Sequence, residues 1–248
     1  MDFALALLAG AFVGSVLGFI GAGGSMLAVP ILLYIFNFTP LAATTGSLAI
    51  VALAAIAGLI PKWRRGEVLV KEALTVWALG LITNIGGALA AKHIHENIIL
   101  TGFAVILIFT GFTMLRAPIA DRAEQKVPLL ALILISLIIG AITGVFGIGG
   151  GFLAIPILVL FFHTPQNKAA GTSLLIIAVN CATSLLGHHA SWHLVRWSIP
   201  LIIAGSAILI SILTSHYSAR VNAKTLRRAF AGTLFAIAIF TILKTWAL

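Results

Sequence analysis

The feature that most constrains this chain is the length of its stretches without a charged side chain. No Lys, Arg, Asp or Glu occurs in residues 3–61, 127–167 or 197–219. A helix crosses the hydrocarbon core of a bilayer with about 20 apolar residues, so each stretch is long enough to cross. Only 8% of all residues are charged, whereas a soluble domain carries about 25%. The sequence therefore predicts an integral membrane protein.

The predicted spanning elements are helices. Lipid offers no partner to backbone N–H and C=O groups, which leaves helices or closed barrels, and the period-two alternation of barrel strands is absent. We therefore expect an all-α polytopic transmembrane bundle. Its apolar segments lie at residues 3–20, 25–36, 41–60, 73–91, 97–115, 129–146, 152–162, 169–187, 197–214 and 229–246.

The chain contains an internal duplication. Residues 18–32 read GFIGAGGSMLAVPIL and residues 144–158 read GVFGIGGGFLAIPIL, with nine of fifteen positions identical at an offset of 126. At the same offset, TTGSLAI at 44–50 faces AGTSLLI at 170–176. We expect a first transmembrane repeat at 1–117, a central cytoplasmic loop at 118–127 and a second repeat at 128–248. Internal duplication is common among secondary transporters.

The distribution of basic residues predicts that the two repeats are inverted. With the loop at 61–72 in the cytoplasm, the positive-inside rule places twelve basic residues inside and three outside, the three being Lys92, Arg196 and Lys244. Parallel repeats of four crossings each would place at best nine basic residues inside and six outside. Five segments per repeat with both termini extracytoplasmic fit better. Segments 25–36 and 152–162 are too short for an upright crossing, which favours broken or re-entrant helices at the glycine-rich signatures; two full crossings remain an alternative.

Glycine clusters and hydroxyls form the candidate site. Glycine permits positive φ and close approach to a ligand, and a helix break frees N–H groups that need an acceptor. Since no carboxylate is expected at mid-membrane, we expect a midplane anion site of backbone N–H groups and hydroxyls. Two alternatives remain: glycines that only pack helices and hydroxyls that bond back to helix carbonyls. The candidates are Gly21, Gly23, Gly24, Ser25, Thr45, Ser47, Gly147, Gly149, Gly150, Gly151, Thr172 and Ser173, with Pro30 and Pro156 as helix-break prolines.

Other side chains that could titrate or bind a metal lie outside the candidate site. His163 is a candidate coupling group because imidazole titrates near neutral pH. The HHASWH stretch at 188–193 is interpreted as a wet interfacial loop rather than a metal site. No catalytic pair, metal site or cofactor site is predicted. The net charge of +9 lies in loops and predicts lipid headgroups, not nucleic acid, as partners.

The motifs resemble one known family. The duplicated G-x-G-G stretch running into L-A-[VI]-P-I-L, followed in each half by a serine-containing helix, is similar to the TauE/SafE family of sulfite exporters over nearly the whole chain. The resemblance implies transport of small sulfur-containing anions, such as sulfite or organosulfonates, across a bacterial inner (plasma) membrane. The signature positions are Gly21, Gly23, Gly24, Pro30, Ser47, Gly147, Gly149, Gly150, Pro156, Thr172 and Ser173.

The two repeats depart from each other within the signature. The first has Thr45-Gly46-Ser47 where the second has Gly171-Thr172-Ser173, and it has Ser25 in place of Gly151. Unequal contributions from the two half-sites are therefore expected. The resulting hypothesis is a secondary anion carrier, not an enzyme, that works by alternating access and is compatible with a homo-oligomer. Alternatives are an anion channel on the same scaffold, a carrier of another small organic anion, and an intramembrane enzyme.

Overall fold

The fold is helical throughout the part of the chain that the structure describes. This computed structural model describes residues 2–22, 24–91, 95–116, 128–146, 154–155, 158–159, 164–218 and 220–246. The long helices are α1 (Asp2–Ile20), α3 (Pro40–Arg64), α4 (Val70–Ala91), α5 (Glu96–Arg116), α6 (Leu129–Phe146), α8 (Gln166–Gly187), α9 (Ser198–Ser218) and α10 (Ala223–Trp246). Shorter elements are α2 (Gly24–Pro30), the π-helix η1 (Ile31–Ile35) and the 3₁₀-helix η2 (His189–Leu194).

Four of the described helices have the length and apolar character of membrane spans. They are the segments Phe3–Ile20, Leu41–Arg64, Gln166–Gly187 and Ser198–Ser218. Charged side chains are costly in hydrocarbon, and in these segments they occur only near one end, at Lys62 and Arg64 of α3 and at Lys168 of α8. The predicted all-α membrane bundle is therefore confirmed.

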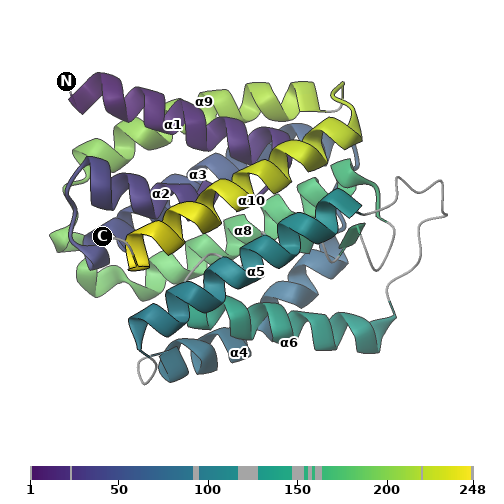
Figure 1. Cartoon of the computed structure of the whole chain (residues 1–248). Helices are drawn as coiled ribbons and strands as arrows, with labels where there is room; N and C mark the ends of the chain where they lie inside the picture. Colours follow the sequence, from purple (N-terminus) through teal and green to yellow (C-terminus); the bar gives the residue numbers. More distant parts are fainter. Residues whose placement is uncertain are drawn as a thin grey trace.

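The long helices run in two opposite directions (Figure 1). Helices α1, α3, α5 and α9 run one way and α4, α6, α8 and α10 the other, so both chain termini lie at the same end of the bundle. Polar contacts agree: α9 follows α3 in parallel, with Ser211 Oγ donating to Ala54 O at 2.9 Å and Ser215 Oγ to Gly58 O at 2.6 Å. Helices that correspond in chain order thus run opposite to each other, as inverted repeats require.

Each half of the chain packs its first helix along a helix of the other half. The first helix of each half packs along the fourth helix of the other, α1 along α9 and α6 along α4. Glycines allow this close approach: a Cβ on Gly14 would stand 2.5 Å from Ala207 O, and one on Gly140 would stand 2.6 Å from Gly80 Cα. Gly140 follows Gly14 by 126 residues, the offset of the sequence duplication.

The turn that leads into the third long helix is also duplicated. The Phe38 N–H donates to Leu32 O at 3.0 Å, and the Thr164 N–H donates to Leu158 O at 3.0 Å. Both residues of the second bond follow those of the first by 126 positions. The repeated sequence therefore gives a repeated backbone hydrogen bond just before α3 and α8.

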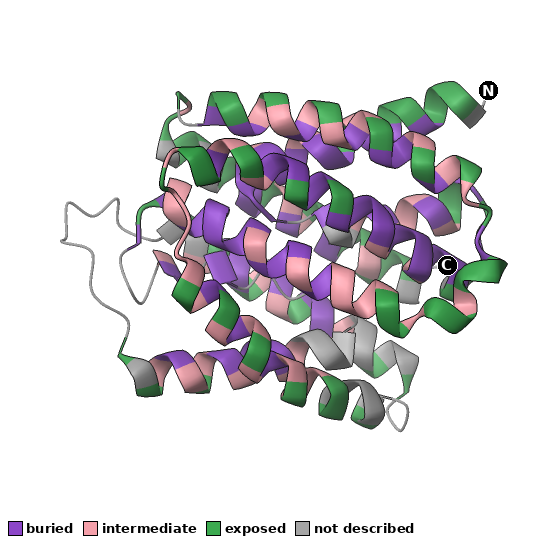
Figure 2. Cartoon of the chain, turned by 180° about the vertical axis from the view of Figure 1, so that it is seen from behind, coloured by how far each residue is buried: buried purple, intermediate pink, exposed green. Residues whose placement is uncertain are grey.

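Burial increases towards the middle of the bundle (Figure 2). Buried residues concentrate on the inner helices α3 and α8, whereas α1, α4, α5 and α10 carry exposed residues on their outer faces. Many exposed side chains are large and apolar, among them Leu8, Phe109 and Leu130. Such an exterior suits hydrocarbon rather than water.

The short second segment turns back along α1. Gly24 contacts Leu17 of α1, and residues 36–39 then reach the start of α3 without regular structure. Pro30 was expected to break the helix, yet its φ of −57° and ψ of −38° keep it helical. The backbone hydrogen-bonding pattern changes from α to π directly after Pro30. This change of pattern lets the helix continue although proline has no N–H to donate.

Candidate functional site

The break after α1 lies against the other half of the chain. Gly21 has a φ of +81°, and a Cβ placed on it would stand 2.6 Å from both Cα and Cβ of Ala170 on α8. Only glycine fits, since any side chain would meet both a strained backbone and a neighbouring helix. Thr172 and Ser173 follow on the next half-turn of α8. The structure therefore brings the first glycine break against the helix that carries the second pair of hydroxyls.

Other glycines of the first cluster pack helices. A Cβ on Gly24 would stand 2.6 Å from Leu17 Cδ1, and one on Gly18 would stand 2.5 Å from Ser211 O. The packing interpretation therefore describes these two positions, while Gly21 is the point of the break. Gly23 and the side chain of Ser25 lie outside the described residues, as do Gly147, Gly149, Gly150, Gly151, Pro156 and His163.

The candidate hydroxyls are buried and mostly bond back to their own helices. Thr45 Oγ1 donates to Leu41 O, Ser47 Oγ to Thr44 O and Thr172 Oγ1 to Lys168 O, each at 2.8 Å. A hydroxyl has one proton, so in this conformation these three cannot also donate to an anion. Each can still accept, and Thr172 Oγ1 accepts the Leu69 N–H at 3.0 Å.

The two hydroxyl groups lie towards opposite ends of the bundle. Helix α3 runs antiparallel to α8 (Figure 1), and Gly58 near the end of α3 lies close to Leu174 near the start of α8. At 1.5 Å per residue, Thr45 lies about 20 Å from Thr172 along the helices. The single midplane shell expected from the sequence is not formed by the described residues, because equivalent positions of two antiparallel helices fall at opposite ends.

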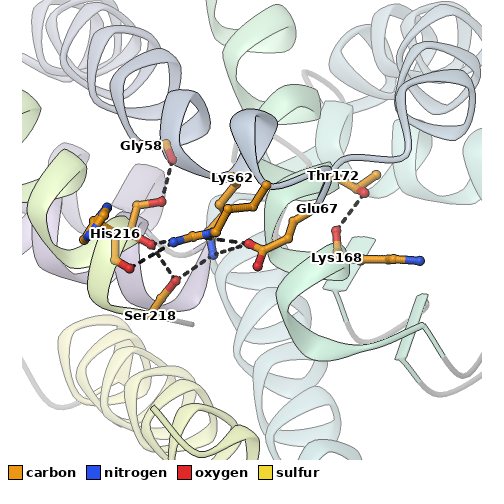
Figure 3. Close-up of polar contacts among 9 residues, drawn as sticks. Gly58, Lys62, Glu67, Lys168, Thr172, His216 and Ser218 are labelled. Carbon is orange, nitrogen blue, oxygen red and sulfur yellow. Dashed lines mark hydrogen bonds and ion pairs between the residues drawn. The ribbon is translucent and has the colours of Figure 1, made fainter. Parts of the chain in front are cut away.

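A charged cluster that the sequence analysis missed joins the two halves near Thr172 (Figure 3). We call it the latch; it comprises Lys62, Arg65, Glu67, Ser215, His216 and Ser218. Lys62 is fully buried, its Nζ donating to Ser218 Oγ at 2.9 Å and lying 4.0 Å from Glu67 Oε2. The basic residues near 62–65 were used only as topology markers, because their partners on α9 are distant in sequence.

Arg65 provides the strongest contacts of the latch. Its guanidinium donates to Ser215 O at 2.8 Å and to His216 O at 2.9 Å, and lies 3.3 Å from Glu67 Oε2. The last four carbonyls of a helix lack N–H donors within it and carry partial negative charge; in α9, Ser215 O accepts from the Ser218 hydroxyl at 2.8 Å. A cation at this position satisfies them, so the α3–α4 loop of the first half is held on a helix of the second.

The same loop covers the start of α8. The Glu67 carbonyl oxygen occupies the space of a side chain at Gly171, and the Leu69 N–H reaches Thr172. A cavity lined by Glu72, Thr172 and apolar residues of α4, α6 and α8 has a volume of about 10 Å³. That is at most the space of one water molecule. The described residues therefore pack closely around Thr172.

One further polar residue was missed by the sequence analysis. Gln166 is the first residue of α8, is 6% exposed and has no hydrogen-bond partner on either amide atom. Sequence patterns placed it in a loop, since the surrounding Pro165, Asn167 and Lys168 are polar or helix-breaking.

The histidine-rich stretch makes local hydrogen bonds. His188 Nδ1 lies 2.8 Å from Ser184 O, and Trp192 Nε1 donates to Leu185 O at 3.0 Å. Nearby, Arg196 donates to Phe36 O at 3.1 Å and lies over the Phe38 ring, again joining the two halves. Among the residues that the structure describes, no group of three His, Cys, Asp or Glu side chains is arranged to hold a metal.

Comparison with known proteins matches this architecture to one family. The model of a family described as sulfite exporter TauE/SafE matches residues 6–241. The chain belongs to the TauE/SafE family. The resemblance seen in the duplicated motif is thereby confirmed, and the protein is a multi-pass membrane transporter.

Relatives of this TauE/SafE chain occur in distant organisms. A probable membrane transporter protein of Xylella fastidiosa is 32% identical over 247 residues, which cover 96% of this chain and 94% of the relative. One from Methanocaldococcus jannaschii is 26% identical, with coverage of 96% and 95%. The YunE protein of Bacillus subtilis, also named a probable membrane transporter, is 24% identical, with coverage of 91% and 92%.

Proposed function

We propose that this chain is a secondary carrier of a small sulfur-containing anion, such as sulfite or an organosulfonate. The observation that carries the proposal is the contact of the Gly21 break in one half with Ala170 on α8 of the other. The end of α1 is thereby held against α8, an oppositely directed helix that also carries the buried hydroxyls Thr172 and Ser173. The sulfur-containing substrate is inferred from the description of the family, sulfite exporter TauE/SafE.

The local electrostatics favour an anion. The first turn of a helix carries partial positive charge and N–H groups without intrahelical acceptors, and α8 presents such a turn close to Gly21. The described acidic residues lie in the α3–α4 loop or in first helical turns, at Glu67, Glu72, Glu96 and Asp2. A carboxylate-based cation site at mid-membrane therefore has no support among them.

Alternating access fits the arrangement of the halves. The opposed directions of corresponding helices support two inverted repeats, a common basis for rocking one half against the other. The latch would then close the end of the bundle that carries Lys62 and Arg65. By the positive-inside rule that end is cytoplasmic, in a bacterial inner membrane, which leaves both termini extracytoplasmic.

Flux into proteoliposomes tests the proposal. Purified protein should move labelled sulfite, thiosulfate or a sulfonate with saturable kinetics. Ser173→Ala should reduce flux at least about tenfold, as expected for loss of a buried hydrogen bond to an ionic ligand. Thr172→Val should do the same if the Thr172 hydroxyl turns from Lys168 O to the anion when substrate binds. Thr233→Val is the matched control, because Thr233 makes the same type of bond, to Ala229 O, on α10. Unitary currents would instead indicate a channel, and no flux of any sulfur anion would refute the substrate class.

A further inference from the structure

Gln166 has hydrogen-bonding capacity that the fold does not use. Its side chain is 6% exposed, yet neither Nε2 nor Oε1 has a partner. Burying an amide without partners costs free energy, and native proteins pair nearly all such groups. An unpaired amide at the start of a long helix is therefore a candidate for contact with a ligand.

The position of Gln166 directs the amide to the first turn of α8. Helical side chains lean towards the N-terminus of their helix, and no side chain caps this one. The first backbone bond of the turn runs from Ala169 N–H to Pro165 O at 3.0 Å. The N–H groups of Gln166 and Asn167 precede it and have no intrahelical acceptor. The Gln166 amide and these two backbone donors therefore belong to the same first turn of α8.

This place faces the glycine break. Residues 166, 170 and 173 share one face of α8, by the spacing of four and then three. Ala170 on that face contacts Gly21, so the Gln166 amide lies one turn from the break towards the start of α8. Lys168, which is half-buried in the same turn, adds positive charge.

The first half has no counterpart of this amide. The position 126 residues earlier is Pro40, the first residue of α3. Proline suits the first turn of a helix but has no N–H and no polar side chain. A contact built on Gln166 therefore exists once per chain, on the second half.

We infer that Gln166 selects substrates that carry both an oxyanion and a hydrogen-bond donor. Nε2 and the N–H groups of Gln166 and Asn167 donate to the oxyanion, and Oε1 accepts from a hydroxyl, an amine or a protonated oxygen of the substrate. Hydrogen sulfite and hydroxyl- or amino-substituted sulfonates satisfy both demands, whereas sulfate does not. The inference rests on the proposed function and names the substrate class of the same site.

Binding of two matched sulfonates tests the inference. Hydroxyethanesulfonate and ethanesulfonate have the same charge and differ by one hydroxyl donor. Their affinities for the purified full-length protein in lipid nanodiscs are measured by calorimetry for the wild type, Gln166→Leu and Gln166→Pro. The control is Asn167→Leu, which changes a less buried amide on the next residue. Wild type should prefer hydroxyethanesulfonate by about tenfold.

Both Gln166 variants should lose that preference and bind more weakly, while Asn167→Leu should retain it. Gln166→Leu should also melt at an unchanged or higher temperature, since it removes an unpaired buried amide; a structural role would lower it. Equal affinities in the wild type, failure to bind either sulfonate, or a preference retained in Gln166→Leu would overturn the inference. If Gln166→Leu keeps the preference while sulfite flux is saturable, the inference fails and the proposed function stands. If the sulfonates bind as expected but no flux is observed, the carrier function fails and the inference about Gln166 stands.

Discussion

Gly21 and Ala170 touch across the two halves of the chain, with space for no additional atom between them. A Cβ on Gly21 would stand 2.5 Å from Ala170 O, at a φ of +81°. We predict that Gly21→Ala lowers the free energy of unfolding by at least about 2 kcal/mol, from left-handed backbone strain plus the clash. It should also reduce flux. Denaturation in detergent and proteoliposome uptake measure both.

Gly66→Ala is the control for that substitution. Gly66 has a similar φ of +69°, but nothing lies within 4 Å of its Cβ position. Gly66→Ala should lower the free energy of unfolding by about 1 kcal/mol, from backbone strain alone, and should leave flux unchanged. Equal losses for the two variants would refute the claim that the contact with α8 is what requires glycine at position 21.

Removing the Glu67 carboxylate should leave the buried Lys62 ammonium group without its anionic partner. Glu67→Gln leaves Lys62, which is 0% exposed, with Ser218 as its hydrogen-bond partner. Breaking a buried ion pair from one side typically costs about 3 to 5 kcal/mol. Because the Lys62–Glu67 distance is 4.0 Å, we expect the lower part of that range. Unfolding in detergent provides the measurement.

The double variant Lys62→Met with Glu67→Gln should be more stable than Glu67→Gln alone. It removes the stranded charge and fills the site with an apolar side chain of similar length. Simple addition of the two single effects would show that Lys62 and Glu67 are not coupled.

Arg65 should matter more than its neighbour Arg64. Arg65→Gln loses charge-assisted hydrogen bonds to two carbonyls of α9, which should cost about 2 kcal/mol. It should also loosen the loop over Thr172. In a Cys181→Ser background, Thr172→Cys should then react faster with a thiol reagent. Arg64 is exposed, and Arg64→Gln should change neither quantity. A labelling rate that Arg65→Gln leaves unchanged would contradict the role of the latch in closure.

The orientation of the chain can be tested separately. Reporter domains fused to the two termini should lie outside the cytoplasm, and an epitope inserted after Gly66, where the Cβ position is open, should lie inside. Protease protection in spheroplasts distinguishes these locations. Termini on opposite sides of the membrane would refute the inverted arrangement and the charge argument behind it.

The sequence predicted most of the helices because hydrocarbon imposes long charge-free stretches. Predicted segments 129–146 and 97–115 match α6 and α5 within a residue at each end. The start of α8 was placed at 169 instead of Gln166, since a proline followed by polar residues is typical of a loop as well as of a first helical turn. This boundary error hid Gln166.

The latch and the π-helix could not be read from the sequence. Lys62 and Ser218 are 156 residues apart, so no local pattern indicates their contact. The π pattern after Pro30 differs from an α-helix only in hydrogen-bond register. The hydroxyls stay predicted site residues. The antiparallel crossing of α3 and α8, which separates Thr45 from Thr172, is a property of the packed bundle.

Counterflow of sulfite tests the central claim most directly. Proteoliposomes preloaded with unlabelled sulfite should accumulate labelled sulfite transiently and faster than empty ones, because an alternating-access carrier exchanges one substrate molecule for another. Entry at the same rate with and without preloading, together with flux that rises linearly with concentration, would contradict a carrier.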